Sequence, residues 1–279
     1  MKNIEKFLVF ILPLFILIGC ADLDLQPTDM IAEDAVKKDP KLVEAFLTKI
    51  YANANFEPNE GRGYPNQDRL TDAVLGGEYT LMAPWQQGIQ ASTHVPTASG
   101  AHSRVAKFQY GNIRSANEII EILSEASFDP QMVKQQIAEA KFLRAWMYFE
   151  MVKRLGGVPL ELEPKQVDAP VEELMIPRSS LKDCYDQIIA DLDAGIADLP
   201  PTAISGKATS MAARALKSRA ALFAARIAKY HPQSANGLTS IPASSAQAYY
   251  QMAHGAASAV IESGRHPLYK GGANLVDNF

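Results

Sequence analysis

The chain has 279 residues, of which 47% are hydrophobic and 21% are charged, and its formal net charge is −4. This apolar content excludes a generally disordered chain, and the acidic balance without a basic stripe argues against nucleic-acid binding. The length allows one large domain or two small ones.

Residues 1–19 have the pattern of an export signal. Two lysines precede the apolar run FLVFILPLFILI, residues 7–18, which is too short to span a bilayer core of about 30 Å. The following stretch LIGC, which ends at Cys20, resembles the lipobox of bacterial lipoproteins, in which the cysteine thiol receives diacylglycerol. We therefore expect removal of residues 1–19, lipidation of Cys20 and anchoring to a membrane. The alternative is a secretory peptide with a chance cysteine.

The rest of the chain divides into a tether and a helical domain. Residues 20–38 are acidic and contain proline, which predicts an extended tether, and residues 39–279 are predicted to form the domain. Apolar residues recur there three and four positions apart, and no run of strand length alternates, so the predicted class is mainly α. The predicted helices cover residues 40–55, 104–126, 129–155, 179–199, 209–230 and 244–263.

The helix predicted at 129–155 is apolar on two faces. Phe142 and Phe149 fall on one face, and Leu143 and Met147 fall on another, which predicts neighbours on both sides. The predicted helix at 209–230 is rich in alanine, so neighbouring helices can approach it closely. Together these patterns predict stacked helix pairs of the tetratricopeptide-like type with long loops, although no fixed repeat period is found.

The sequence contains no recognisable catalytic set. The five histidines lie in unrelated contexts without metal-ligand spacing, and there is no serine elbow, phosphate loop or dinucleotide fingerprint. Asp191 and Asp193 are expected to be solvated helix charges, Arg144 to snorkel or to pair, and Cys184 to be a small packing residue. The chain is therefore predicted not to be an enzyme, with no cofactor and no metal.

Five stretches resemble the N-terminal part of the SusD/RagB family of outer-membrane lipoproteins from Bacteroidota. The most specific is AEAKFLRAWMYFEMVKRLGGVPL, residues 138–160, which looks like the family's helix that ends in Gly-Gly-Val-Pro. The others begin at Cys20 or cover residues 110–117, 206–216 and 256–269. Family members are considerably longer, so the chain resembles a fragment that lacks the C-terminal region.

The resemblance implies a lipid-anchored protein of the outer membrane, exposed at the cell surface, that binds glycans and breaks no bond. Its implied partners are an oligosaccharide or other nutrient ligand, and a SusC-like TonB-dependent transporter to which the ligand is delivered. Two alternatives stay open. One is a helical-repeat lipoprotein scaffold that binds protein partners without a sugar site, and the other is an anchored hydrolase, for which the sequence offers no site.

Residues 58–103 are the predicted ligand-bearing loop. This segment is rich in Gly, Pro, Asn and Ser, and loops longer than about 15 residues are usually functional or disordered. A sugar-binding site needs flat aromatic rings for the faces of the sugar and amides or charges for its hydroxyls. Trp85 could instead plug the loop onto the helices. The candidate platforms are Trp85, Tyr79 and Tyr64, and the candidate hydrogen-bonding residues are Asp72, Arg69 and Gln86.

Overall fold

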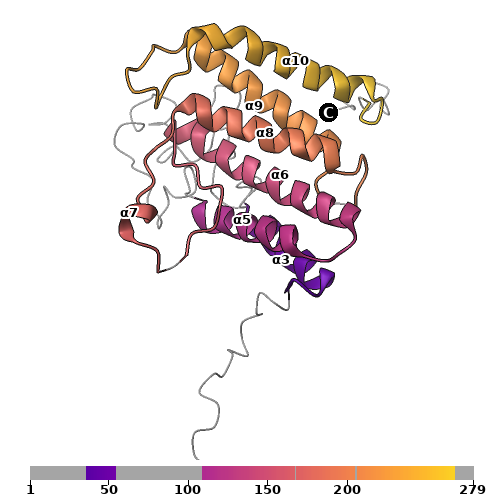
Figure 1. Cartoon of the computed structure of the whole chain (residues 1–279). Coiled ribbons are helices and arrows are strands. Elements are labelled where there is room, and N and C mark those ends of the chain that lie inside the picture. The colour runs from indigo at the N-terminus through magenta and orange to yellow at the C-terminus, as the bar shows by residue number, and fades with distance from the viewer. Residues whose placement is uncertain (1–35, 55–108, 167, 205, 268–279) are drawn as a thin grey trace, which may run out of the picture.

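The long helices of the protein lie side by side in the order of the chain (Figure 1). The computed structural model describes residues 36–54, 109–166, 168–204 and 206–267, and none of them is in a strand. None of the helices in these ranges is long and apolar enough to cross a membrane. The predicted class, mainly α with stacked helices, is confirmed. The stack runs in the order α3 (Pro40–Asn53), α5 (Tyr110–Glu125), α6 (Pro130–Leu155), α8 (Leu181–Asp198), α9 (Ser210–Tyr230) and α10 (Ala246–Glu262).

Side chains cap the starts of α3, α6, α8 and α9. The carboxylate of Asp129 accepts hydrogen bonds from the backbone of Gln131 and Met132, and Pro130 is the first residue of α6. The hydroxyl of Ser180 accepts from the backbone of Asp183 at the start of α8. Because such signals are local, the predicted ends agree with the observed ends to within two residues wherever both are described. Two short elements were not predicted, α7 (Val171–Leu174) and the 3-10 helix η3 (Ala243–Ser245).

The central helix α6 is buried on both of its predicted apolar faces. It lies between α5 and α8, and it also touches α9. The ring of Phe149 meets the ring of Tyr185 on α8 and that of Phe223 on α9, both edge-on, with centroid distances of 6.4 and 5.5 Å. The prediction of neighbours on two sides is therefore confirmed. The buried residues of the two faces include Ala138, Ala140, Phe142, Leu143, Ala145, Met147, Phe149, Met151 and Val152.

The alanines of α9 allow its neighbours to come close. Gly195 on α8 faces Ala213 on α9, and a Cβ added to Gly195 would lie 3.4 Å from the Cβ of Ala213. Because the two helices lie so close, their atoms make dispersion contacts with each other that larger side chains would otherwise provide. The alanines buried along α9 are Ala213, Ala220, Ala221, Ala224, Ala225 and Ala228.

The Gly-Gly-Val-Pro ending of α6 is where three segments of the chain meet. Gly156 has a φ of 74°, which favours glycine, and a Cβ on Gly157 would overlap the carbonyl oxygen of Ser179. The amide of Gly157 donates to the carbonyl of Leu238 over 2.6 Å. The guanidinium of Arg178 donates to the carbonyls of Gly157 and of Leu155, the last residue of α6, so this ending is held from both sides.

Candidate functional site

The residues proposed from the sequence for ligand binding and lipidation lie outside the described part of the chain. They therefore remain predictions. The structure describes the helical scaffold that would carry them. Two polar features of this scaffold are a buried hydrogen-bond network between α5, α6 and α8 and a hollow on α10. The residues outside the described ranges are Cys20, Tyr64, Arg69, Asp72, Tyr79, Trp85 and Gln86.

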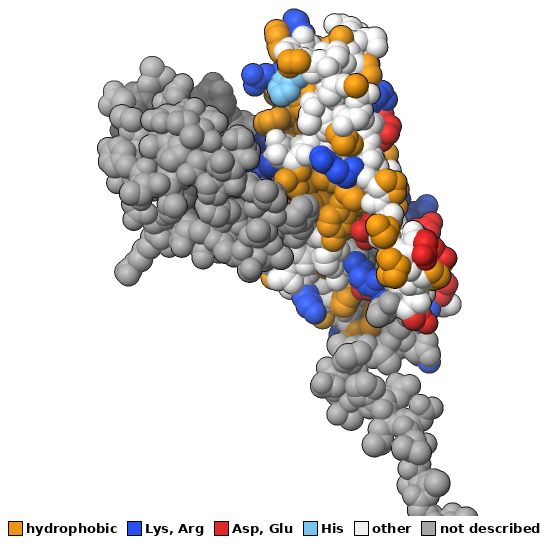
Figure 2. All heavy atoms as spheres, turned by 90° about the vertical axis from the view of Figure 1, so that its left-hand side faces the viewer, with side chains coloured by type: hydrophobic (Ala, Val, Ile, Leu, Met, Phe, Trp, Pro, Cys, Tyr) orange, Lys and Arg blue, Asp and Glu red, His pale blue; other side chains and the backbone are white. Residues whose placement is uncertain are grey.

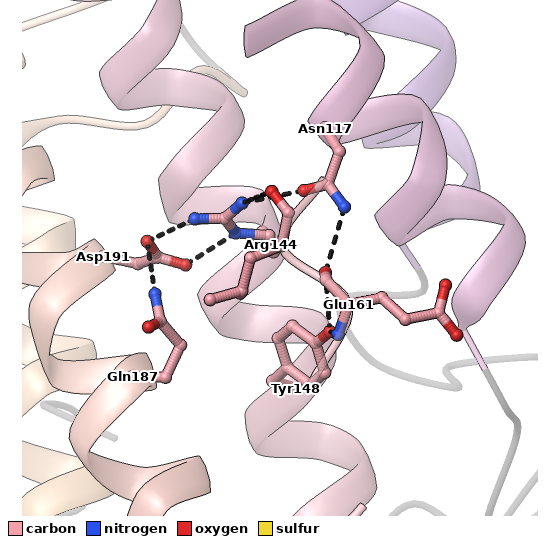
Figure 3. A network of polar contacts seen from close by, with 7 residues as sticks. Asn117, Arg144, Tyr148, Glu161, Gln187 and Asp191 are labelled. Carbon is pink, nitrogen blue, oxygen red and sulfur yellow. Dashed lines mark hydrogen bonds and ion pairs between the residues drawn. The ribbon is translucent and has the colours of Figure 1, made fainter. Parts of the chain in front are cut away.

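The centre of the buried network is an ion pair between Arg144 on α6 and Asp191 on α8 (Figure 3). Arg144 donates from Nε and Nη2 to the two carboxylate oxygens of Asp191, over 2.8 and 2.7 Å. The two side chains are only 6% and 4% exposed. The planar guanidinium fits the carboxylate at two points, and Gln187 donates a further hydrogen bond to Asp191 over 3.1 Å.

The ion pair between Arg144 and Asp191 tests two predictions that were made from the sequence. Arg144 was expected to snorkel or to pair, and it pairs. Asp191 was expected to be a solvated helix charge, and that prediction is wrong, because Asp191 lies on the buried face of α8 against α6. Its partner is 47 residues away in the chain, so no local spacing could have indicated the pair.

The network continues onto the backbone of the segment that follows α6. Arg144 donates from Nη1 to the side-chain oxygen of Asn117 on α5, over 2.7 Å, and to the carbonyl of Leu162, over 3.2 Å. Asn117 donates to the carbonyl of Glu161 over 3.0 Å. The hydroxyl of Tyr148 donates to that carbonyl over 2.9 Å and accepts from the amide of Glu161 over 2.7 Å. We call this arrangement the α6 clamp.

The α6 clamp holds a chain segment that has no regular secondary structure of its own. Burying backbone N–H and C=O groups without hydrogen-bond partners costs free energy, and side chains of α5 and α6 supply these partners. Figure 3 shows the carboxylate of Glu161 pointing away from the network, while the backbone of Glu161 takes part in it. Burial raises the pKa of Tyr148 well above its ordinary value, so its hydroxyl keeps the proton that it donates.

Cys184 supports the same segment from α8. It is fully buried, the amide of Val158 donates to its sulfur over 3.4 Å, and the thiol donates to the carbonyl of Val158 over 3.5 Å. Burial raises the pKa of this thiol, which keeps it in the unreactive protonated form. The prediction of a small packing residue is confirmed.

The α6 clamp is a structural centre with no features of a reaction site. Its two charges are paired with each other, and the side chains of Arg144, Asn117 and Asp191 are buried and hydrogen-bonded within the protein. Among the described residues, no three His, Cys, Asp or Glu side chains lie close enough together to hold a metal ion. A sequence signal for the clamp did exist, since Arg144, Asn117 and Asp191 each interrupt an apolar helix face.

The second polar feature is a shallow hollow on the outer side of α10. Gln247, Tyr250, Gln251 and His254 line it, at the spacing that puts residues on one face of a helix. The opposite face of α10 is buried against the stack through Tyr249 and Ala253. The sequence analysis did not single out these lining residues. A mixture of amide, aromatic and imidazole side chains at helical spacing was the signal that could have indicated them.

Comparison with known proteins places the chain among the relatives of one family. A model of the SusD-like family, described as starch-binding and associating with the outer membrane, matches residues 23–222. SusD-like protein P2 of Formosa agariphila is 26% identical over 216 residues, which cover 74% of this chain and 41% of that protein. A SusD-like protein of Bacteroides ovatus is 27% identical over 225 residues, 77% of this chain and 38% of that protein. The chain thus spans about two fifths of these relatives.

Solved structures show the same helical stack. A SusD-like protein from Bacteroides fragilis superposes with a TM-score of 0.58 at 26% identity, over 87% of this chain and 42% of that one. A SusD-like carbohydrate-binding protein of the same organism has a TM-score of 0.59 at 20% identity, over 83% and 42%. A laminarin-binding SusD-like protein has a TM-score of 0.50 at 24% identity, over 68% and 43%.

Proposed function

Because this chain belongs to the SusD-like family, we propose that it binds a glycan at the outer membrane and delivers it to a SusC-like TonB-dependent transporter. The observation that carries the proposal is the family match over residues 23–222, which runs from the tether through the predicted loop to α9. Members of the family are non-catalytic binding proteins, in agreement with the prediction that the chain is not an enzyme.

The described helices give this proposal its physical basis. A binding protein must hold its ligand contacts in a fixed geometry, since ordering them at the moment of binding would cost affinity. The α6 clamp and the Gly-Gly-Val-Pro ending fix α5, α6 and α8 relative to one another. Residues 58–103 lie in the chain between α3 and α5, so their two ends join a stack of packed helices.

The ligand site that we propose lies in residues 58–103. Trp85 would carry the face of a sugar ring, with Tyr79 and Tyr64 as further platforms. Among glycans, the first to test are the starch type in the family's description and the laminarin type that a solved relative binds. Hydrogen bonds to the sugar hydroxyls would come from Asp72, Arg69 and Gln86.

The lipid anchor and the partner are further parts of the proposal. The sequence LIGC at Cys20 supports lipidation, and the family's association with the outer membrane supports that location. The acidic tether that follows would let the helices stand away from the lipid and reach a neighbouring transporter.

Two measurements test the proposed function. Calorimetric titration of the full chain with malto-oligosaccharides and laminari-oligosaccharides should detect saturable binding, and affinity purification from membranes should recover a large TonB-dependent porin. Recovery of other proteins with no binding of any saccharide would favour the alternative, a helical-repeat scaffold without a sugar site.

A further inference from the structure

We propose that the outer face of α9 and α10 carries a second carbohydrate contact, and that this contact takes acidic sugars. The inference rests on the proposed function, because it assumes that the chain handles glycans. It concerns a different part of the chain from residues 58–103 and a different class of sugar. The contact consists of the α10 hollow together with Lys229 and Tyr230 at the end of α9.

The hollow has the side chains that a sugar requires. Tyr250 is half-buried and packs against the core, so its ring is held in place and offers an apolar surface. Gln247 and Gln251 supply planar amides that both donate and accept hydrogen bonds, and His254 supplies an imidazole. A ring beside two amides matches the apolar faces and the hydroxyl rim of a pyranose.

A cation lies beside this hollow. The ammonium of Lys229 is 5.8 Å from the centroid of the Tyr250 ring and 5.2 Å from that of the Tyr230 ring. Both distances are within the range of a cation–π contact. Tyr230 is 66% exposed, so a second aromatic ring is available to a ligand on the same side. The charge is therefore positioned between two rings before any ligand arrives.

The surrounding charges favour an anion. Although the chain contains 31 acidic residues, residues 199–261 contain none, while they contain six Lys or Arg and two His. Two of these lysines are paired, Lys207 with Glu44 and Lys217 with Asp193. Lys229 and Arg226 form no ion pair with any described carboxylate.

The uneven distribution of charge is visible on the surface. In Figure 2 most acidic side chains gather around the projecting α7 segment, whereas at the upper end of this face, at α9 and α10, most of the charged side chains in view are basic. A neutral sugar would fit the ring and the amides, but an acidic sugar would also form a charge-assisted hydrogen bond with the ammonium of Lys229, which has no ion pair with a described carboxylate. The favoured ligand is thus a glycan with uronate carboxylates or sulfate esters.

The test is calorimetric titration of the full chain at low ionic strength with three probes. These are an oligogalacturonate for the carboxylate, a sulfated galactan oligosaccharide for the sulfate ester, and maltotetraose as a neutral sugar. One or both acidic probes should bind in a way that depends on Lys229, and the probe that binds identifies the anionic group. Binding of maltotetraose, which we propose for residues 58–103, should not depend on Lys229. This binding should weaken with added salt, because the contact with Lys229 is at the surface.

Variants locate the contact. Tyr250→Ala should raise the Kd of the acidic probe at least about five-fold, the lower end of the range for stacking on an aromatic ring. Lys229→Gln should also raise it, while Lys229→Arg should preserve it. Lys49→Gln on α3, at the opposite end of the stack, removes the same charge from an exposed position and should have no effect. Gln251→Ala, also exposed, tests the hollow should Tyr250→Ala fail to fold.

Several results would overturn the inference. It fails if no acidic probe binds, if such a probe binds equally well to the wild type and to the Lys229→Gln and Gln251→Ala variants, or if maltotetraose binds the hollow as tightly as an acidic probe. Its failure can be told apart from failure of the proposed function. Neutral-glycan binding that depends on Trp85, together with no binding of either acidic probe, would uphold the proposed function and overturn this inference.

Discussion

Arg144 and Asp191 face each other across the α6–α8 contact with both carboxylate oxygens engaged, at 2.8 and 2.7 Å. Both groups are almost completely removed from water. A buried pair of this kind contributes little net stability compared with apolar residues of the same size, but removal of one partner leaves an uncompensated charge. The pair therefore makes the packing of α6 on α8 sensitive to single substitutions.

Arg144→Met should destabilise the protein by about 3–5 kcal/mol, a large part of a typical total of about 5–15 kcal/mol. The double variant Arg144→Met with Asp191→Leu removes both charges and should recover much of that loss. Urea denaturation of the wild type, both single variants and the double variant measures the coupling. A single variant as stable as the wild type would show that the ion pair is not needed to maintain the packing.

Two glycines should respond in opposite directions to the same change. Gly157→Ala should cost about 1–3 kcal/mol or more, because the new Cβ would overlap the carbonyl of Ser179. Gly255, inside α10, has nothing within 4 Å of such a Cβ, so Gly255→Ala should stabilise by about 0.5–1 kcal/mol. Thermal unfolding of the two variants measures both effects. Equal shifts of the melting temperature would mean that the Gly-Gly-Val-Pro ending can relax.

Glu139 on α6 should make stability depend on pH. Burial raises the pKa of this carboxyl, against a smaller opposite effect of its hydrogen bond with Tyr51, and Lys207 and Glu44 also act on it. The folded state therefore holds the proton more tightly than the unfolded state. The stabilisation is complete below the ordinary pKa of 4.5 and is lost as pH rises through the raised value.

Glu139→Gln removes this titration. The variant should be less stable relative to the wild type at pH 4 than at pH 7.5, and it should gain relative stability as pH rises between these values. Paired urea denaturations across this range measure the difference in unfolding free energy. A difference that is independent of pH would show that the folded and unfolded states bind the proton of Glu139 equally.

The parts of the fold that could be predicted are those with local causes. Helix starts depend on residues such as Asp129 and Ser180, which cap the turn that follows them, and the two apolar faces of α6 are visible in its own sequence. The α6 clamp has distant causes, since Arg144, Asn117 and Asp191 come from three helices. Their positions were visible as polar interruptions, but the pairing required the packing order of α5, α6 and α8.

The candidate ligand site was predicted from side-chain chemistry, whereas the helices were predicted from local patterns. Trp85 and the other candidates were chosen because aromatic and polar side chains share a long loop, and they lie outside the part of the chain that the structure describes. The α10 hollow was missed for a different reason. Apolar periodicity over residues 244–263 indicates the buried stripe that contains Tyr249, but it carries no signal for polar residues on the outer face of the helix.

Lipidation should depend on a single residue. Labelled fatty acid should enter the wild-type protein in its bacterial host, and Cys20→Ala should abolish the labelling. The chain has only one other cysteine, so Cys184→Ala is a matched control that should keep the label. In intact cells the wild type should be cleaved by added protease if it is displayed at the surface. An unlabelled, readily extracted wild-type protein would contradict the anchor.

The glycan site should depend on Trp85. If its ring carries a sugar face, Trp85→Ala should weaken binding of a malto- or laminari-oligosaccharide by about 1–3 kcal/mol, by analogy with bases stacked on aromatic side chains, and leave the melting temperature unchanged. Trp85→Phe keeps a flat ring and should retain part of the affinity. The other tryptophan, Trp146, is only 8% exposed in α6, so a fluorescence change on titration that is absent from Trp85→Phe would come from position 85. Intact binding with a lowered melting temperature would instead show that Trp85 packs the loop onto the helices, because a residue that serves only packing affects folding and leaves the affinity of the folded protein unchanged.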